Sequence, residues 1–150
     1  MEKFPKKMKV LFLCTGNSCR SQMAEAWTRY LKSDQIEPYS AGVVPKGVDS
    51  RTVKAMAEVG IDISSQTSKD VSSMGSLEFE YVVTLCDNAR ESCPFFPAKT
   101  RLLHIGFDDP PSLAADARNE EEAMVHYRRV RDEIKKFVET LPDALKGTGN

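Results

Sequence analysis

The sequence lacks a long apolar run, and it lacks an excess of charge of either sign. A membrane-spanning helix needs about 20 consecutive apolar residues, and no stretch of this chain approaches that length. The 21 basic and 22 acidic residues leave a formal net charge of −1, which gives no global attraction to nucleic acid or to an anionic membrane. These absences predict a soluble cytoplasmic protein with neither nucleic acid nor a membrane as partner.

Cysteine is scarce, with 4 residues in a chain of 150. This number is too small for a secreted disulfide scaffold, and the spacings lack the paired C-x2-C of zinc modules. The sequence therefore predicts no metal site, and reactive or buried thiols are the remaining explanations. A chain of this length buries a core without disulfides, so we expect one domain over residues 1–150, with flexible ends at about 1–8 and 144–150. No exposed apolar stripe demands a dimer, which favours a monomer.

Segments of strand character alternate with segments of helix character. Strands are predicted over 9–13, 37–41, 81–85 and 101–105, and helices over about 21–31, 50–59 and 119–141. This alternation predicts an α/β fold, a three-layer sandwich with a four-stranded parallel sheet flanked by helices. In the last helix, apolar residues recur every three or four positions, so we expect one stripe to pack on the sheet while the charged side faces water.

The most informative segment is the strand-to-helix junction Cys14-Thr15-Gly16-Asn17-Ser18-Cys19-Arg20-Ser21. Backbone N–H groups at a helix N-terminus, together with the helix dipole, favour a tetrahedral anion. The same field stabilises the thiolate of a cysteine, which otherwise ionises near pH ~8.5. Cys14 is therefore the candidate nucleophile, Arg20 can bind two oxygens of the anion, and Ser21 can donate a hydrogen bond to the sulfur.

The residues predicted to bind the anion form one loop: Thr15, Gly16, Asn17, Ser18, Cys19 and Arg20. We interpret the Cys19 side chain as packing, because side chains of such loops commonly point away from the ligand. A C-x5-R pattern occurs by chance, but a preceding strand, a following helix and a serine after the arginine strengthen it. The alternatives are a buried strand-end cysteine beside a surface arginine, or a secretion signal, for which the apolar stretch is too short.

A second pair of cysteines follows another predicted strand. The carboxyl ends of neighbouring parallel strands share one crevice, so Cys86 and Cys14 would face one anion if their strands are neighbours. Residues seven apart on a helix are ~10 Å apart, beyond the ~7 Å reach of a disulfide. Joining Cys86 to Cys93 would therefore require the segment between them to unwind. We interpret the pair as a redox switch, with two buried structural cysteines as the alternative.

An acidic pair before two prolines also follows a predicted strand. Such a pair is a turn by default, but expelling an oxygen from an oxyanion needs a proton donor. Asp109, fixed by the proline after it, is the candidate general acid, with Asp108 as the fallback. His104 and His126 are further acid–base candidates, although they fit a strand end and a helix surface better.

These motifs resemble the low-molecular-weight protein tyrosine phosphatase fold, and with Cys86 and Cys93 they are most similar to the thioredoxin-coupled arsenate reductases. The resemblance covers most of the chain, in residues 13–25, 39–42, 53–56, 58–64, 82–86, 106–110 and 130–134. Phosphatases of this family follow their aspartate–proline with aromatic residues that line a phosphotyrosine slot. Pro111-Ser112-Leu113 follows here, which argues against an aryl phosphate substrate.

The resemblance implies reduction of arsenate to arsenite, in arsenic detoxification. Cys14 would attack arsenic while Asp109 protonates the departing oxygen. Cys86 would then attack the Cys14 sulfur and release arsenite, and Cys93 would attack Cys86, which leaves an outer disulfide for thioredoxin. Three alternatives stay open: a glutathione–glutaredoxin couple as reductant, a phosphatase of small phosphorylated substrates, and an anion or redox sensor.

The resemblance implies no resident cofactor, with one question about potassium. Some relatives are reported to hold a potassium ion beside the loop, at positions that match Asn17, Glu25 and Ser40 and at an acidic residue that aligns with Lys69. Our hypothesis is that the Lys69 ammonium takes the place of the cation near Glu25. The loop would then be independent of potassium.

Overall fold

The computed structural model describes residues 6–94, 96–97 and 99–147. It contains the predicted sheet of four parallel strands, in the order β2-β1-β3-β4. The strands are β1 (Met8–Cys14), β2 (Ile36–Gly42), β3 (Tyr81–Thr84) and β4 (Arg101–His104). Every residue from Val10 to Leu13 is fully buried. Because alternate residues of a strand point to opposite faces, both faces of β1 are covered, as the three-layer prediction requires.

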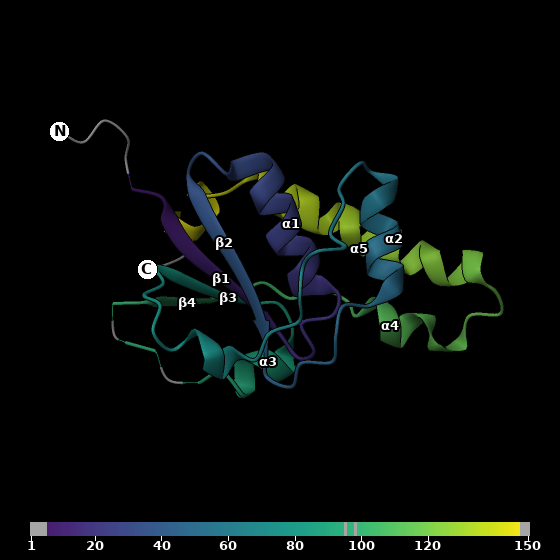
Figure 1. Ribbon diagram of the computed structural model, residues 1–150, viewed down its shortest axis with the longest axis horizontal. Coiled ribbons are helices and arrows are strands. Elements are labelled where there is room, and N and C mark those ends of the chain that lie inside the picture. The colour runs from purple at the N-terminus through teal and green to yellow at the C-terminus, as the bar shows by residue number, and fades with distance from the viewer. Residues whose placement is uncertain (1–5, 95, 98, 148–150) are drawn as a thin grey trace.

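The predicted long helices are present. They are α1 (Arg20–Lys32), α2 (Ser50–Glu58) and α5 (Glu120–Glu139). In Figure 1, α1 lies between the strands and α5, and it packs against both β2 and α5. Asn119 caps α5 by accepting a hydrogen bond from Glu122 N at 2.9 Å, and acidic residues fill the first turn of that helix. Both features stabilise a helix N-terminus.

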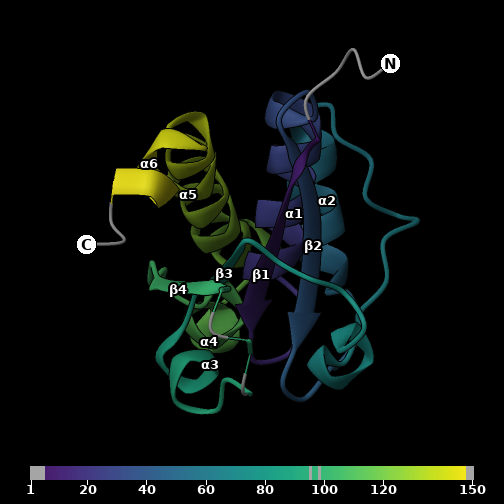
Figure 2. The same ribbon diagram turned by 90° about the vertical axis from the view of Figure 1, so that its left-hand side faces the viewer.

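Short elements join these long ones. They are η1 (Val71–Met74), α3 (Asp87–Glu91), α4 (Pro110–Leu113), η2 (Ala114–Asp116) and α6 (Asp143–Gly147). In Figure 2, α3 and α4 both lie on the side of the molecule toward which the arrowheads of β1 and β2 point, and Figure 1 shows them apart from each other. The acidic pair directly precedes α4, with Asp109 at its N-cap and Pro110 in its first turn, a position that a proline's fixed φ suits.

Two expectations from the sequence are corrected. The C-terminal end predicted as flexible begins inside α6, where Leu145 is fully buried, because its apolar side chain packs in the core. At the other end Met8 already belongs to β1, while 1–5 and 148–150 lie outside the described residues. The charged side of α5 is not wholly solvated either. Arg131 is 8% exposed and donates to Ala55 O at 2.9 Å, which ties α5 to α2.

The apolar stripe of α5 is buried as predicted at Tyr127, Val130, Ile134 and Val138. Among the described residues, no helix is both long and apolar enough to cross a membrane.

Candidate active site

The carboxyl ends of β1 and β3 meet at one edge of the sheet. Leu13 lies opposite Thr84 in the parallel register, and Leu85 N donates to Leu13 O at 2.9 Å. The residues that follow the two strands therefore adjoin: Thr15 Oγ1 is 3.3 Å from Cys86 Sγ. We expected Cys14 and Cys86 to face the same crevice if their strands were neighbours. In the structure, β1 and β3 are neighbours.

Cys14 is buried at the start of the loop, beside a hydroxyl donor. Its sulfur is 2.9 Å from Ser21 Oγ. Asn17 Nδ2 donates to the same Ser21 oxygen at 2.7 Å. Because Asn17 uses a lone pair of that oxygen, the Ser21 hydrogen is free to point toward the sulfur. The contact predicted between Ser21 and Cys14 is present.

Asn17 has the left-handed backbone conformation that turns the loop. Its φ is 47°, a value that asparagine adopts more readily than most residues. Its side chain is held at both ends, since Oδ1 also accepts from Lys69 N at 2.8 Å. Gln22, which was not predicted to have a role, donates to Asn17 O at 3.0 Å and to Thr67 O at 2.9 Å. These contacts fix the loop before any anion binds.

Arg20 and Asp109 close the crevice from the other side. An Arg20 Nη2 to Asp109 Oδ1 distance of 3.4 Å makes them an ion pair, and Arg20 Nη1 donates to Phe107 O at 3.0 Å. Asp108 points elsewhere, to Arg129 of α5 at 3.0 Å. A cavity of about 210 Å³ is lined by Cys14, Thr15, Gly16, Ser18, Cys19, Arg20, Lys46, Asp109 and Pro111. Of the two aspartates, only Asp109 lines it.

The remaining cysteines differ in environment. Burial raises the pKa of the Cys19 thiol, which agrees with its interpretation as a packing residue. Cys86 is 8% exposed and caps α3, its sulfur accepting from Ala89 N at 3.4 Å. Cys93 follows the end of α3, is half-buried, and burial raises the pKa of its thiol as well. All four cysteines are free thiols.

The two histidines lie outside the cavity. His104 Nδ1 is 2.8 Å from Thr84 Oγ1, and its Nε2 is 3.2 Å from Asp87 Oδ1. His104 therefore joins β3 and β4 to the first residue of α3, which is a structural arrangement. His126 is half-buried on α5. Within the described residues, no group of three or more His, Cys, Asp or Glu side chains is placed to hold a metal ion.

The segment after β2 runs along the anion loop. Val44 N donates to Thr15 O at 2.9 Å, and Lys46 N donates to Gly16 O at 2.9 Å. Gly42 makes this approach possible: a Cβ there would stand 2.7 Å from Thr15 O, which is far inside van der Waals contact. Lys46 is a cavity residue that the sequence did not predict, because an exposed lysine in a loop belongs to no recognisable spacing.

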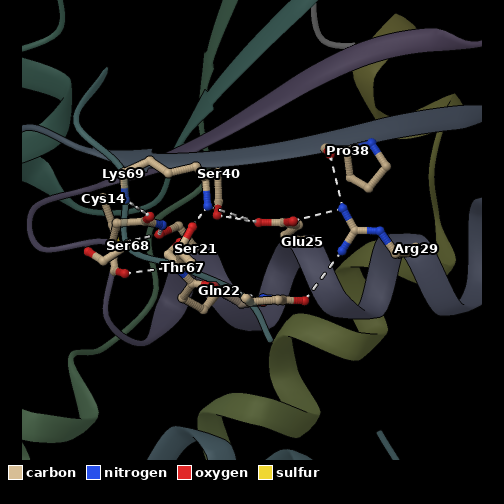
Figure 3. Close-up of polar contacts among 12 residues, drawn as sticks. Cys14, Ser21, Gln22, Glu25, Arg29, Pro38, Ser40, Thr67, Ser68 and Lys69 are labelled. Carbon is tan, nitrogen blue, oxygen red and sulfur yellow. Dashed lines mark hydrogen bonds and ion pairs between the residues drawn. The ribbon is translucent and has the colours of Figure 1, made fainter. Parts of the chain in front are cut away.

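The buried carboxylate of Glu25 lies at the centre of the group of polar contacts shown in Figure 3. Glu25 of α1 accepts from the Ser40 hydroxyl and pairs with Arg29 at 2.7 Å. Lys69 Nζ lies 3.8 Å from Glu25 Oε1. Burial lowers the pKa of Lys69, and the nearby Glu25 opposes that shift. Two cations thus already face this carboxylate.

Taken together, the crevice contains a buried thiol with a hydroxyl donor, a guanidinium, a carboxyl group and a second thiol close by. A thiolate at a helix N-terminus is suited to attack a tetrahedral oxyanion. The carboxyl group is placed to donate a proton, and the second thiol to attack a sulfur adduct.

Comparisons with known proteins agree with this geometry. The sequence model of the family described as low molecular weight phosphotyrosine protein phosphatase matches residues 9–149. An arsenate reductase of Shouchella clausii is 50% identical over 138 residues, covering 89% of this chain and 97% of that protein. One from Halalkalibacterium halodurans is 46% identical over 140 residues, with 93% and 99% covered. A solved arsenate reductase in its phosphate-binding state superposes with a TM-score of 0.72 at 30% identity, covering 89% and 95%.

Proposed function

Because the chain belongs to the low molecular weight phosphotyrosine protein phosphatase family, we propose that it uses the phosphatase crevice to reduce arsenate to arsenite. The observation that carries this proposal is the distance of 3.3 Å between Cys86 Sγ and Thr15 Oγ1 of the anion loop. A phosphatase needs one thiol and water, whereas a reductase needs a second thiol within reach of the first. The arsenate reductases that share up to 50% identity with this chain support the same substrate.

The first step forms a bond between sulfur and arsenic. The Cys14 thiolate attacks arsenic, and an oxygen leaves as water after Asp109 donates its proton. Arg20 and the N–H groups of the loop hold the remaining oxygens, and Ser21 stabilises the thiolate before the attack. Arsenic is still pentavalent in this adduct.

The second step transfers the electrons. Cys86, as a thiolate, attacks the Cys14 sulfur, which forms a disulfide and breaks the arsenic–sulfur bond. The electron pair of that bond stays on arsenic, which leaves as trivalent arsenite. Cys93 then attacks Cys86, which frees Cys14 and moves the disulfide to Cys86–Cys93.

The third thiol becomes reactive only when α3 opens. In the folded helix, burial raises the pKa of Cys93 and so disfavours its thiolate. Unwinding residues 87–92 would expose the thiol and shorten the path to Cys86. The same opening would present the outer disulfide to thioredoxin, which returns both sulfurs to thiols. Such a cycle suits the reducing cytoplasm and a monomeric protein.

The test of the proposed function is a comparison of two substrates. With thioredoxin, thioredoxin reductase and NADPH, we expect the intact protein to produce arsenite from arsenate continuously, and we expect Cys14→Ser to produce none. Hydrolysis of an aryl phosphate without any arsenite would make the protein a phosphatase. Turnover of neither substrate would favour a sensor. Production of arsenite with glutathione and glutaredoxin, but not with thioredoxin, would identify glutaredoxin as the reductant.

We further propose that the protein has no potassium site. The oxygen atoms at the positions implied by the resemblance are already used: Asn17 Oδ1 accepts from Lys69 N at 2.8 Å, and Glu25 Oε1 faces Lys69 Nζ at 3.8 Å. A potassium ion there would stand against an ammonium group. The residues present therefore do not fit the ion, and no step of the reaction passes through it.

Exchanging sodium for potassium chloride at constant ionic strength is therefore expected to leave the melting temperature and turnover of the intact protein unchanged. Lys69→Asp, which restores an acidic residue, should gain stability from potassium alone, by about 1.4 kcal/mol when the ion is at ten times its Kd. Thermal unfolding in the two salts measures both proteins. A clear rise in the melting temperature of the intact protein with potassium would contradict the proposal.

A further inference from the structure

We infer that Lys46 is a second cation for the oxyanion, acting beside Arg20 at the rim of the crevice. The inference rests on the proposed function for the identity of the substrate, arsenate. It rests on the geometry alone for the class of ligand, a tetrahedral oxyanion of phosphate shape.

The position of Lys46 is fixed by the backbone. Residues 43–49 follow the anion loop through four backbone hydrogen bonds, from Val43 N to Cys14 O, from Val44 N to Thr15 O, from Lys46 N to Gly16 O and from Asp49 N to Ser18 O, at 3.3, 2.9, 2.9 and 3.0 Å. This pairing sets Lys46 directly against the middle of the loop. Its side chain can therefore approach the anion only from the solvent side of the crevice.

The side chain lies over the loop. A Cβ built on Gly16 would be 3.4 Å from both Cγ and Cδ of Lys46, so the absence of a side chain at Gly16 leaves room for the lysine stem. Lys46 lines the same cavity of about 210 Å³ as Cys14, Arg20 and Asp109. The methylene groups therefore lie over Gly16, and the side chain is long enough to keep its ammonium group in contact with solvent.

The cavity would have a single cationic side chain, Arg20, to balance the charge of the anion if Lys46 did not take part. Arg20 is the other cationic residue in its lining, and its guanidinium pairs with Asp109 at 3.4 Å. Lys46, by contrast, forms no ion pair with any carboxylate in the described part of the chain. An anion with two negative charges is better balanced by a guanidinium fork and a separate ammonium than by a guanidinium fork alone.

Lys46 is expected to act on affinity and not on the chemical step. An ammonium at the rim contacts oxygens of the anion that do not leave, so it stabilises the bound substrate and the transition state equally. Removing it should raise KM and leave kcat unchanged. Because the group is exposed, the contribution should be modest and should weaken as salt is added.

The experiment compares Lys46→Met with Lys136→Met. Methionine keeps the stem that packs over Gly16 and removes only the charge. Lys136 is an exposed lysine in the last turn of α5, at the end of that helix away from α3 and α4 (Figure 2). Its loss therefore controls for net charge. Two quantities are measured: the KM and kcat for arsenate, and the Kd for inorganic phosphate by titration calorimetry, which needs no turnover.

For Lys46→Met we expect KM and the phosphate Kd to rise about five- to tenfold, with kcat within about twofold of the intact protein. Lys46→Arg should restore both constants, and Lys136→Met should leave them unchanged. An unchanged phosphate Kd in Lys46→Met, or an equal change in Lys136→Met, would overturn the inference. If phosphate binding weakens as expected but no protein makes arsenite, the role of Lys46 stands and the proposed reductase activity fails.

Discussion

Cys86→Ser is expected to stop arsenite production completely, while Cys93→Ser should stop it after a single turnover. Serine keeps the size of each side chain but cannot attack a sulfur. Without Cys86 the adduct on Cys14 has no nearby thiol to release it, so the arsenic stays pentavalent. Without Cys93 the first disulfide forms and one arsenite leaves, but Cys14 remains bonded to Cys86.

The two variants are measured with enzyme and arsenate at equal concentrations and then with excess arsenate and the thioredoxin system. The intact protein should exceed Cys93→Ser by at least about 10³-fold in arsenite per protein over many turnovers, a loss typical of removing a group that acts in the reaction itself. Mass spectrometry of the proteolysed Cys93→Ser protein should find a Cys14–Cys86 disulfide. Steady turnover by Cys86→Ser would mean that an external thiol completes the reaction, and the relay would be wrong.

The structural basis of this prediction is the contrast between the thiols. Cys86 caps α3 and lies beside the anion loop, so it can act without a large movement. Cys93 lies beyond the last turn of α3 and is half-buried, where burial raises its pKa. The proposed relay therefore predicts a local first transfer and a second transfer that requires α3 to unwind. His104 Nε2 lies 3.2 Å from Asp87 Oδ1, and this contact would break if the first turn of α3 opened.

The sequence predicted those parts of the site that depend on local spacing. The loop from Cys14 to Ser21 and the strand before it follow from residues adjacent in the chain, and both are present. The neighbouring positions of Cys14 and Cys86 depended on the order of the strands. The sequence left that order open, and in the structure it is β2-β1-β3-β4, which makes β1 and β3 neighbours.

The sequence did not predict features that depend on contacts between distant segments. Lys46 enters the cavity because Gly42 allows the chain after β2 to approach the loop, which no periodicity encodes. Arg131 is buried because Ala55 and Glu58 of α2 supply its acceptors. The C-terminal helix α6 is ordered because Leu145 finds a place in the core. In each case a contact with a residue distant in the sequence, and not the local preference of the residue, determines where the side chain lies.

Asp109→Asn is expected to slow formation of the adduct on Cys14 by about 10²–10⁴-fold, the usual effect of removing a general acid, whereas Asp108→Asn should change it by less than about threefold. Asparagine keeps the shape of each side chain but has no acidic proton. Asp109 lines the cavity beside Arg20, while Asp108 faces Arg129 in an exposed ion pair, and such pairs contribute only ~0–1 kcal/mol to stability.

Comparing Asp109→Asn with Asp108→Asn distinguishes the loss of a proton donor from a general disturbance of the segment that contains both residues. Single-turnover formation of arsenite is measured at one pH in the intact protein and in both variants. The intact protein and Asp108→Asn should form arsenite at similar rates, whereas Asp109→Asn should be slower by the factor given above. Equal losses in the two variants would show that the carboxyls share the role. A loss in Asp108→Asn alone would assign the acid to Asp108, which would then have to leave Arg129 and turn toward the crevice.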